Sequence, residues 1–236
     1  MITWEEFAWA VFYFGVISGD IKRDSDYLTL MRQDQFLQCL RTNPKTIEVD
    51  DIREKIISDF LNRWKCRIKN TRGVASAIRT SIKRLLGHLN ALHDLRVESF
   101  QPDFVVDIEA DQMTISEVIE RCYGQIRKIG YRFGPTATSK LLHILQPALF
   151  VMWDNPILDN YRKINSQVSD SGKGYCTYLL MMQDIAALVS RTFQNPIDYL
   201  NTQLQYSPPK TMAKYLDEYN WITITLGVQV PPVWHP

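Results

Sequence analysis

The chain has few of the residue groupings that bind metals or form disulfide frameworks. Its four cysteines stand at positions 39, 66, 122 and 176, so none forms a Cys-x-x-Cys pair or a zinc-ligand spacing. We interpret them as free thiols of an intracellular protein. The HExxH, Walker and GxSxG patterns are also missing, and no serine or cysteine has a recognisable base partner. The sequence therefore predicts no metal site and none of the chemistry that these motifs support.

Long apolar runs are missing as well. The most apolar stretch, residues 7–17, is shorter than a membrane span of about 20 residues. It follows Glu5 and Glu6 rather than basic residues, so it does not resemble a signal peptide. Thr3 and Glu6 fit a capping box, which predicts a buried amphipathic first helix. We therefore expect a cytoplasmic protein with no membrane partner.

Helical periodicity is what the sequence does contain. With 236 residues and 45% hydrophobic content, the chain is long enough for one large or two small domains with a core of their own. Apolar residues recur at helical spacing almost throughout, which predicts an all-α fold. The expected helices span residues 3–18, 25–41, 49–66, 72–92, 114–129, 136–145, 156–164, 174–193, 196–204 and 209–219. Residues 94–113 are expected to form a loop, and the tail from Ile222 to be extended, because Thr-Ile-Thr and Val-Gln-Val favour that backbone.

The positive charge is unevenly distributed along the chain. The formal net charge is only +1, yet no acidic residue occurs between Phe60 and His93. The candidate DNA-binding side chains in this window are Arg63, Lys65, Lys69, Arg72, Lys83 and Arg84. Such a patch can follow a phosphate backbone, with counterion release making the affinity fall as salt rises. The alternative is a solvated basic face with no ligand.

A helix, a tight turn and a second helix are predicted at about residues 115–145. Thr114 and Glu117 offer a capping box for the first helix, and Gly130 suits its left-handed end. The turn then reaches Gly134 and Pro135, which suits the first turn of the next helix. Backbone N–H groups at such a helix start can hold a phosphate directly or through a cation. The candidate DNA contacts of this hairpin are Gly130, Arg132, Gly134 and Thr136, with Arg121, Arg127 and Lys128 nearby.

The run from Gly134 to Asp154 resembles the active-site signature of the helix-hairpin-helix (HhH-GPD) DNA glycosylase superfamily. Gly134, Ala137 and Asp154 match positions of the superfamily's motif, and the interval from Gly134 to Asp154 is the one that the superfamily has. Arg132 stands where the first glycine of the usual Gly-x-Gly would fall, so the chain resembles a divergent member. The resemblance implies one helical domain at 45–150 that carries the hairpin, and a second formed by 1–44 and 151–236. A cleft between them would hold Asp154.

The resemblance also implies how the glycosidic bond is broken. Relatives with lyase activity have a lysine two residues after the last hairpin glycine, where this chain has Thr136. This departure implies a monofunctional enzyme that leaves an abasic site. Lys140, one helical turn further on, shares a face with Thr136 and is the alternative nucleophile, or else a plain helix-surface lysine. Many relatives carry an iron–sulfur cluster on closely spaced cysteines near the C-terminus, and a chain whose last cysteine is Cys176 cannot build one. No cofactor is expected beyond a monovalent cation at the hairpin.

Asp154 is the predicted catalytic residue. Cleavage of an N-glycosidic bond builds an oxocarbenium-like sugar, which a fixed carboxylate can stabilise while it orients or deprotonates water. The alternative is structural, because Asp154 precedes Asn155 and Pro156 and would be a good N-cap for the next helix. Both roles can coexist in one side chain.

An extruded base needs walls, and aromatic side chains near Asp154 are the natural choice. The predicted base pocket consists of Trp153, Asn155, Tyr161 and Trp221. Each aromatic residue among them has core packing as its alternative.

The sequence as a whole thus predicts a monomeric DNA glycosylase that acts on double-stranded DNA of the nucleoid. It would remove a damaged base in repair, or a hypermodified base from phage DNA in antiviral defence. One rival is a non-catalytic DNA-binding protein that keeps the hairpin for phosphate contact. Another is a helical interaction protein with no nucleic-acid role, which would show no salt-dependent affinity for duplex DNA.

Overall fold

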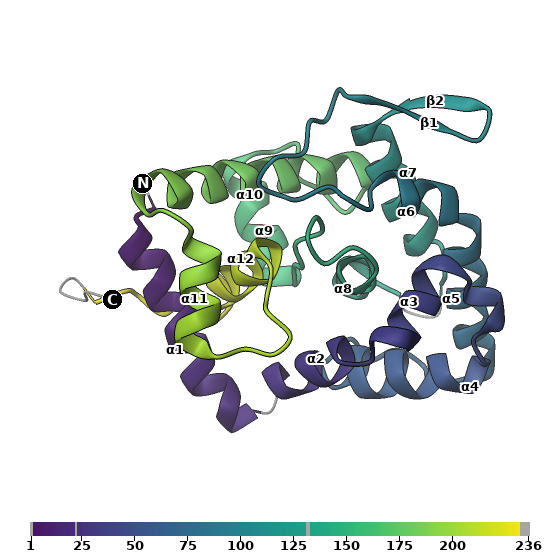
Figure 1. The fold of residues 1–236 in the computed structure, drawn as a ribbon, viewed down its shortest axis with the longest axis horizontal. Coiled ribbons are helices and arrows are strands. Elements are labelled where there is room, and N and C mark those ends of the chain that lie inside the picture. The colour runs from purple at the N-terminus through teal and green to yellow at the C-terminus, as the bar shows by residue number, and fades with distance from the viewer. Residues whose placement is uncertain (1, 22, 131–132, 232–236) are drawn as a thin grey trace.

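The computed structural model describes residues 2–21, 23–130 and 133–231 and confirms the all-α prediction (Figure 1). The first half contains α1 (Trp4–Ile21), α2 (Arg23–Met31), α3 (Asp34–Thr42), the 3-10 turn η1 (Pro44–Thr46), α4 (Val49–Asp51), the π-helix η2 (Ile52–Asn62), α5 (Arg72–Arg84) and α6 (Leu86–Ala91). The second half contains β1 (Val105–Ile108), β2 (Asp111–Thr114), α7 (Ile115–Arg127), α8 (Pro135–Leu145), α9 (Asn155–Ile164), α10 (Gly172–Thr192), α11 (Pro196–Leu204), α12 (Met212–Asn220) and the π-helix η3 (Trp221–Thr225).

Local capping chemistry sets several of these helix starts as predicted. The Thr3 hydroxyl accepts from Glu6 N–H, and the Glu6 carboxylate accepts from Thr3 N–H. Thr114 and Glu117 form the same reciprocal pair at α7. Each box satisfies two N–H groups that a helix start leaves without an intrahelical partner.

Several segments differ from the sequence expectation. The expected helix 25–41 is divided into α2 and α3, and the expected helix 72–92 into α5 and α6. Within the predicted 94–113 loop, β1 and β2 form an antiparallel hairpin that pairs Val105 with Thr114 and Ile108 with Asp111. The tail was expected to be extended from Ile222, but residues 221–225 continue α12 as a π-helix. Ile222 is fully buried there against Ala10 and Phe14 of α1, so tertiary packing overrides the β-propensity of Thr-Ile-Thr.

Helix α8 lies at the centre of the molecule, seen nearly end-on in Figure 1. Every residue from 137 to 145 is buried, so this helix has no solvent face. Its polar side chains are hydrogen-bonded to their surroundings. The Ser139 hydroxyl donates to the Trp153 carbonyl, and His143 Nδ1 donates to the Phe150 carbonyl at 2.6 Å. Burial lowers the pKa of His143 to about 4, so the imidazole is neutral and its Nε2 accepts from the Tyr27 hydroxyl.

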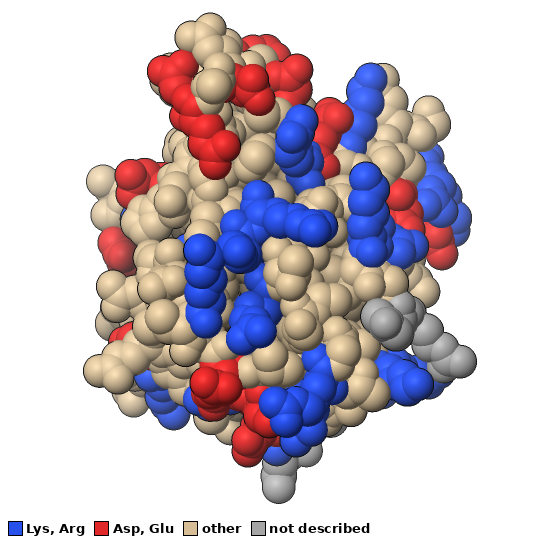
Figure 2. Space-filling view, turned by 90° about the vertical axis from the view of Figure 1, so that its right-hand side faces the viewer, with Lys and Arg blue, Asp and Glu red and all other residues tan. Residues whose placement is uncertain are grey.

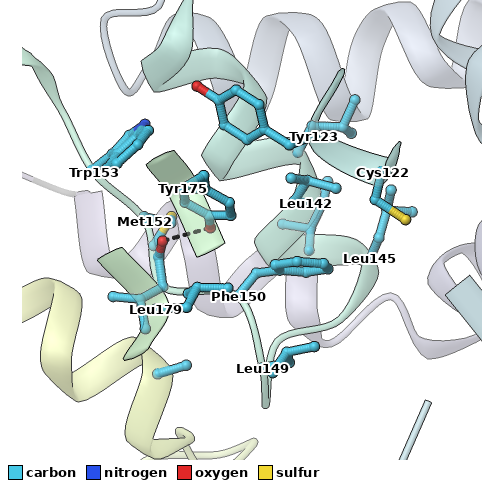
Figure 3. Packing of buried hydrophobic residues seen from close by; sticks show 14 of the residues in the cluster. Cys122, Tyr123, Leu142, Leu145, Leu149, Phe150, Met152, Trp153, Tyr175 and Leu179 are labelled. Carbon is cyan, nitrogen blue, oxygen red and sulfur yellow. Dashed lines mark hydrogen bonds between the residues drawn. The ribbon is translucent and has the colours of Figure 1, made fainter. Parts of the chain in front are cut away.

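The segment between α8 and α9 is held inside the core and thereby places Asp154. Figure 3 shows Phe150 and Trp153 packed among buried side chains that include Tyr175. The Tyr175 hydroxyl donates to the Val151 carbonyl at 2.8 Å, and the Tyr178 hydroxyl donates to the Met152 carbonyl at 3.1 Å. The backbone leading to Asp154 is therefore fixed by both packing and hydrogen bonds.

The hairpin between α7 and α8 follows the predicted local chemistry where it is described. Gly130 has φ +78°, the left-handed conformation that favours glycine. Gly134 is the residue before α8, and Pro135 occupies its first turn. Arg127 donates to the Phe133 carbonyl at 2.8 Å and pairs with Asp170, so it braces the turn. Arg132 and its predicted phosphate contact lie outside the described residues.

Candidate active site

A cavity of about 520 Å³ opens at the start of α9 and contains most of the predicted site. Its lining residues include Phe14, Trp64, Lys65, Thr136, Lys140, Trp153, Asp154, Asn155, Asp217, Trp221, Thr225 and Leu226. Residues from the predicted 45–150 domain and from the two terminal segments meet around it. The domain division itself stays a prediction.

Asp154 combines the two roles that the sequence left open. Its Oδ1 accepts from the N–H of Ile157 at 3.0 Å, so it is the N-cap of α9. The Thr225 hydroxyl lies 3.0 Å from Oδ1 and 2.9 Å from Oδ2 as a donor. The side chain is only partly buried and lines the cavity, so a bound molecule can reach a carboxylate that the protein already holds in place.

The protonation of Asp154 is set by opposing effects. Burial raises the pKa of this carboxyl, and the Ile157 N–H and Thr225 hydroxyl lower it by stabilising the charged form. The nearby carboxylate of Asp217 raises the pKa, whereas the ammonium of Lys140 lowers it. The net shift is upward from the ordinary aspartate value, as is usual for a carboxylate in a partly desolvated cleft.

Lys140 belongs to the cavity and is not the surface lysine of the alternative interpretation. Its side chain is 7% exposed, and Nζ donates to the Trp64 carbonyl at 2.9 Å. That carbonyl begins a turn in which Lys65 and Arg67 have φ of 62° and 53°, a region that side chains other than glycine adopt at a cost. Lys140 thus stabilises a strained turn at the cavity and adds positive charge beside Asp154.

Aromatic rings form much of the cavity wall. Trp153 is 1% exposed, and its Nε1 donates to the Pro135 carbonyl at 3.2 Å. Trp221 is partly exposed and meets Phe14 edge to face, with ring centroids 5.7 Å apart. Asn155 is exposed at the same cavity.

The placement of Tyr161 in the base pocket was wrong. This residue is 5% exposed, does not line the cavity, and its hydroxyl donates to Asn220 Oδ1 at 2.8 Å. It lies in the second turn of α9, where its ring meets the ring of Tyr178 of α10 edge to face. The core alternative therefore holds for Tyr161.

Sequence reasoning missed Thr225 and Leu226. Thr225 holds Asp154, and Leu226 is 45% exposed at the cavity. Both follow from the π-helix η3, which turns the chain back toward α9. No sequence signal pointed to them, because the β-branched run at 222–225 favours an extended strand.

The predicted basic residues do not form one uniform patch. Lys65 lines the cavity, whereas Lys69, Lys83 and Arg84 are exposed without a described ion pair. Two others are paired: Arg63 lies 2.6 Å from Asp26 and 3.6 Å from Asp59, and Arg72 lies 3.3 Å from Asp50. These acids come from outside the 60–93 window, so part of its positive charge is neutralised.

A groove of about 880 Å³ runs between α5, α6, β2 and α7. Arg84, Arg121 and Lys128 line it, together with acids that include Asp111 and Glu117. On the face that Figure 2 shows, Lys and Arg side chains gather below the acidic β1–β2 hairpin. The positive charge on this face therefore lies next to a negatively charged edge.

Metal and membrane features were sought in the described residues. They contain no group of three or more His, Cys, Asp or Glu side chains placed to hold a metal, and no helix long and apolar enough to span a bilayer. The four cysteines are free thiols. Thr136, two residues after Gly134, lines the cavity, and the monovalent cation expected at the hairpin stays a prediction.

Comparison of the chain with protein-family models, with curated proteins and with solved structures finds no match. The resemblance to the glycosylase superfamily therefore rests on the sequence from Gly134 to Asp154 alone and stays a prediction.

Proposed function

We propose that the chain is a monofunctional DNA glycosylase that hydrolyses the N-glycosidic bond of a damaged or modified base and leaves an abasic site. The observation that carries this proposal is the cavity in which a fixed carboxylate, Asp154, lies among aromatic rings and the Lys140 ammonium. The pocket volume of about 520 Å³ is within the range typical of small-ligand sites and is ample for a base.

The chemistry needs a single carboxylate. As the bond between C1′ and the base nitrogen breaks, its electron pair leaves with the base and positive charge develops on the sugar. Asp154 stabilises that charge electrostatically, and its carboxylate accepts a proton from the water that attacks C1′. A donor held by the protein at a developing charge contributes about 2.7–4 kcal/mol in well-studied enzymes, and a fixed carboxylate opposite a cation works on the same principle.

The cavity walls suit an extruded base. Stacking on the partly exposed ring of Trp221 offsets part of the few kcal/mol that unstacking a base costs. Leu226, exposed at the same cavity, is an apolar side chain suited to fill the space that the base leaves in the duplex. The exposed Lys83 and Arg84 would contact the phosphate backbone beside the hairpin.

One observation favours the rival, a non-catalytic DNA-binding protein. The two oxygens of Asp154 already accept hydrogen bonds from Ile157 and Thr225, so a purely structural role accounts for the residue. The two functions differ in whether any base is released.

The deciding experiment incubates the protein with duplexes that each carry one damaged or phage-type hypermodified base. Free base is scored by mass spectrometry and abasic sites by alkali-labile breaks. We expect release from at least one duplex and a loss of about 100- to 1,000-fold in Asp154→Asn, since asparagine caps a helix as well as aspartate but carries no charge. The matched control is Asp159→Asn, on the exposed face of the same helix, where Asp159 pairs only with Arg162 among the ion pairs described.

Base release that persists in Asp154→Asn would show that the mechanism is wrong. Salt-dependent duplex binding without release from any substrate would favour the non-catalytic rival. Strand breaks without alkali would point to lyase chemistry at Lys140.

A further inference from the structure

Five charged side chains are buried together beside the cavity, and the mechanism above does not use them. This buried ion cluster consists of Asp24, Lys210, Lys214, Asp217 and Glu218, each no more than 7% exposed. Lys210 Nζ lies 2.7 Å from Asp24 Oδ1 and 2.6 Å from Glu218 Oε1. Lys214 Nζ lies 2.9 Å from Asp217 Oδ2 and 3.0 Å from Glu218 Oε1.

Lys214 is a fixed cation at the middle of this cluster. Burial by itself lowers its pKa, but the carboxylates of Glu218, Asp217 and Asp24 outweigh that effect and raise the pKa above the usual lysine value. Its ammonium also lies over the ring of Trp64, 5.1 Å from the centroid, and Trp64 lines the cavity. Replacing such clusters by apolar side chains is often neutral or stabilising, so stability alone gives no reason for their presence.

Asp217 joins the buried ion cluster to the cavity. Asp217 is 6% exposed and lines the same cavity as Asp154. The charge of Asp217 raises the pKa of Asp154. The short contact to Lys214 and the anchoring of α12 fix where its carboxylate stands. A molecule bound beside Asp154 therefore meets a second carboxylate whose position it cannot easily change.

A carboxylate accepts hydrogen bonds and cannot donate them. Among the standard bases, a guanine-type Watson–Crick edge offers two adjacent donors, the N1–H and the 2-amino group. Adenine and cytosine place one amino group beside an acceptor nitrogen, and thymine and uracil place one N–H between two carbonyls. A base that turns an acceptor toward Asp217 loses its hydration without gaining a partner.

We propose that Asp217 is the specificity-determining residue of the cavity and selects a modified base with a guanine-type edge, whose adjacent N–H donors it binds. This inference rests on the proposed glycosylase function. The aromatic walls stack on any base, since every base has a π-face, so discrimination falls to the polar groups of the pocket.

The test compares bases that differ at this edge alone. Duplexes carrying 8-oxoguanine or N7-methylguanine are paired with duplexes carrying the hypoxanthine analogues, which lack the 2-amino group. We expect the wild-type protein to release at least one of the guanine-type bases with a kcat/KM about 10- to 100-fold above that of its hypoxanthine analogue, the effect of one hydrogen bond to a charged group. In Asp217→Asn this ratio should fall toward 1, while Asp159→Asn keeps it.

Binding to a duplex with a tetrahydrofuran abasic-site analogue and thermal unfolding verify that Asp217→Asn is folded and still binds DNA. The wild-type ratio needs no variant, so it can refute the proposal even if Asp217→Asn does not fold. Release confined to bases without the paired donors, or equal release of both members of a pair, overturns the role of Asp217 and leaves the glycosylase proposal standing. No release from any DNA of the full panel overturns both.

Discussion

Replacing Thr225 with valine removes one hydroxyl and keeps the shape of the side chain. That hydroxyl donates to the carboxylate of Asp154, from 2.9 Å and 3.0 Å to its two oxygens. After the change, the Ile157 N–H remains as the backbone donor to this carboxylate. Thr225→Val therefore tests how far the proposed reaction depends on holding Asp154 in place and ionised.

The size of the effect follows from the hydrogen bond that is lost. A hydrogen bond to a charged group contributes about 1.5–3 kcal/mol, and water can replace part of it because Asp154 is only partly buried. We take the lower end, about 1.5 kcal/mol, which corresponds to a loss in kcat/KM of about 10-fold. The hydroxyl also lowers the pKa of Asp154, so its removal raises that pKa further. Because Asp154 acts in its ionised form, activity is lost as the pH falls through this pKa, and the acid limb should move to higher pH in Thr225→Val.

The assay is the pH profile of kcat/KM for base release, with Thr223→Val as the matched control. Thr223 lies two residues earlier in η3, and its hydroxyl donates to the Tyr219 carbonyl at 2.8 Å. It should leave the acid limb where the wild type has it. An unchanged rate and acid limb in Thr225→Val, or an equal shift in both variants, would refute the reasoning.

Three further predictions concern stability, chemistry and DNA contact. Burial lowers the pKa of His143 to about 4, so the unfolded state binds a proton at this residue first as the pH falls from about 6.5 to 4. The free energy of unfolding should therefore fall by about 3 kcal/mol between pH 7 and pH 4. Urea unfolding at the two pH values measures this loss, which should be missing in His143→Gln. Borohydride should trap no covalent DNA adduct, because the Lys140 ammonium donates to the Trp64 carbonyl. An adduct that forms with the wild type and disappears in Lys140→Gln would identify this lysine as a nucleophile. The double change Lys83→Gln and Arg84→Gln should reduce the salt slope of duplex binding by about 1–2. Arg72→Gln should change the slope less, because Arg72 is already paired with Asp50. Equal effects of the two changes would contradict the assignment of Lys83 and Arg84 as phosphate contacts.

Most of the helices could be predicted because their signals are local. The capping boxes at Thr3 and Thr114 and the first-turn Pro135 act within one turn of the chain. Apolar periodicity then indicates which face of a helix is buried, as it did for α7, whereas α8 is buried on every side from residue 137 to 145. The position of Asp154 at the start of a helix and next to Trp153 was readable for the same reason.

The contacts that depend on distant parts of the chain could not be read in this way. Periodicity shows that Tyr161 faces inward, but not whether a cavity or α10 lies on that side. A run of basic residues shows its own charge, but not that Asp26 and Asp50 will pair with Arg63 and Arg72.

The sequence by itself determined the helical class, the hairpin with its left-handed Gly130, and a carboxylate at the N-terminus of a helix. Only the tertiary structure decided that Thr225 would hold that carboxylate, that Lys140 would lie inside the cavity, and that Asp217 would face the same space. The physical reason is range. Capping and periodicity act over three or four residues, whereas η3 turns back toward α9 because Ile222 is buried against α1, more than 200 residues earlier in the sequence.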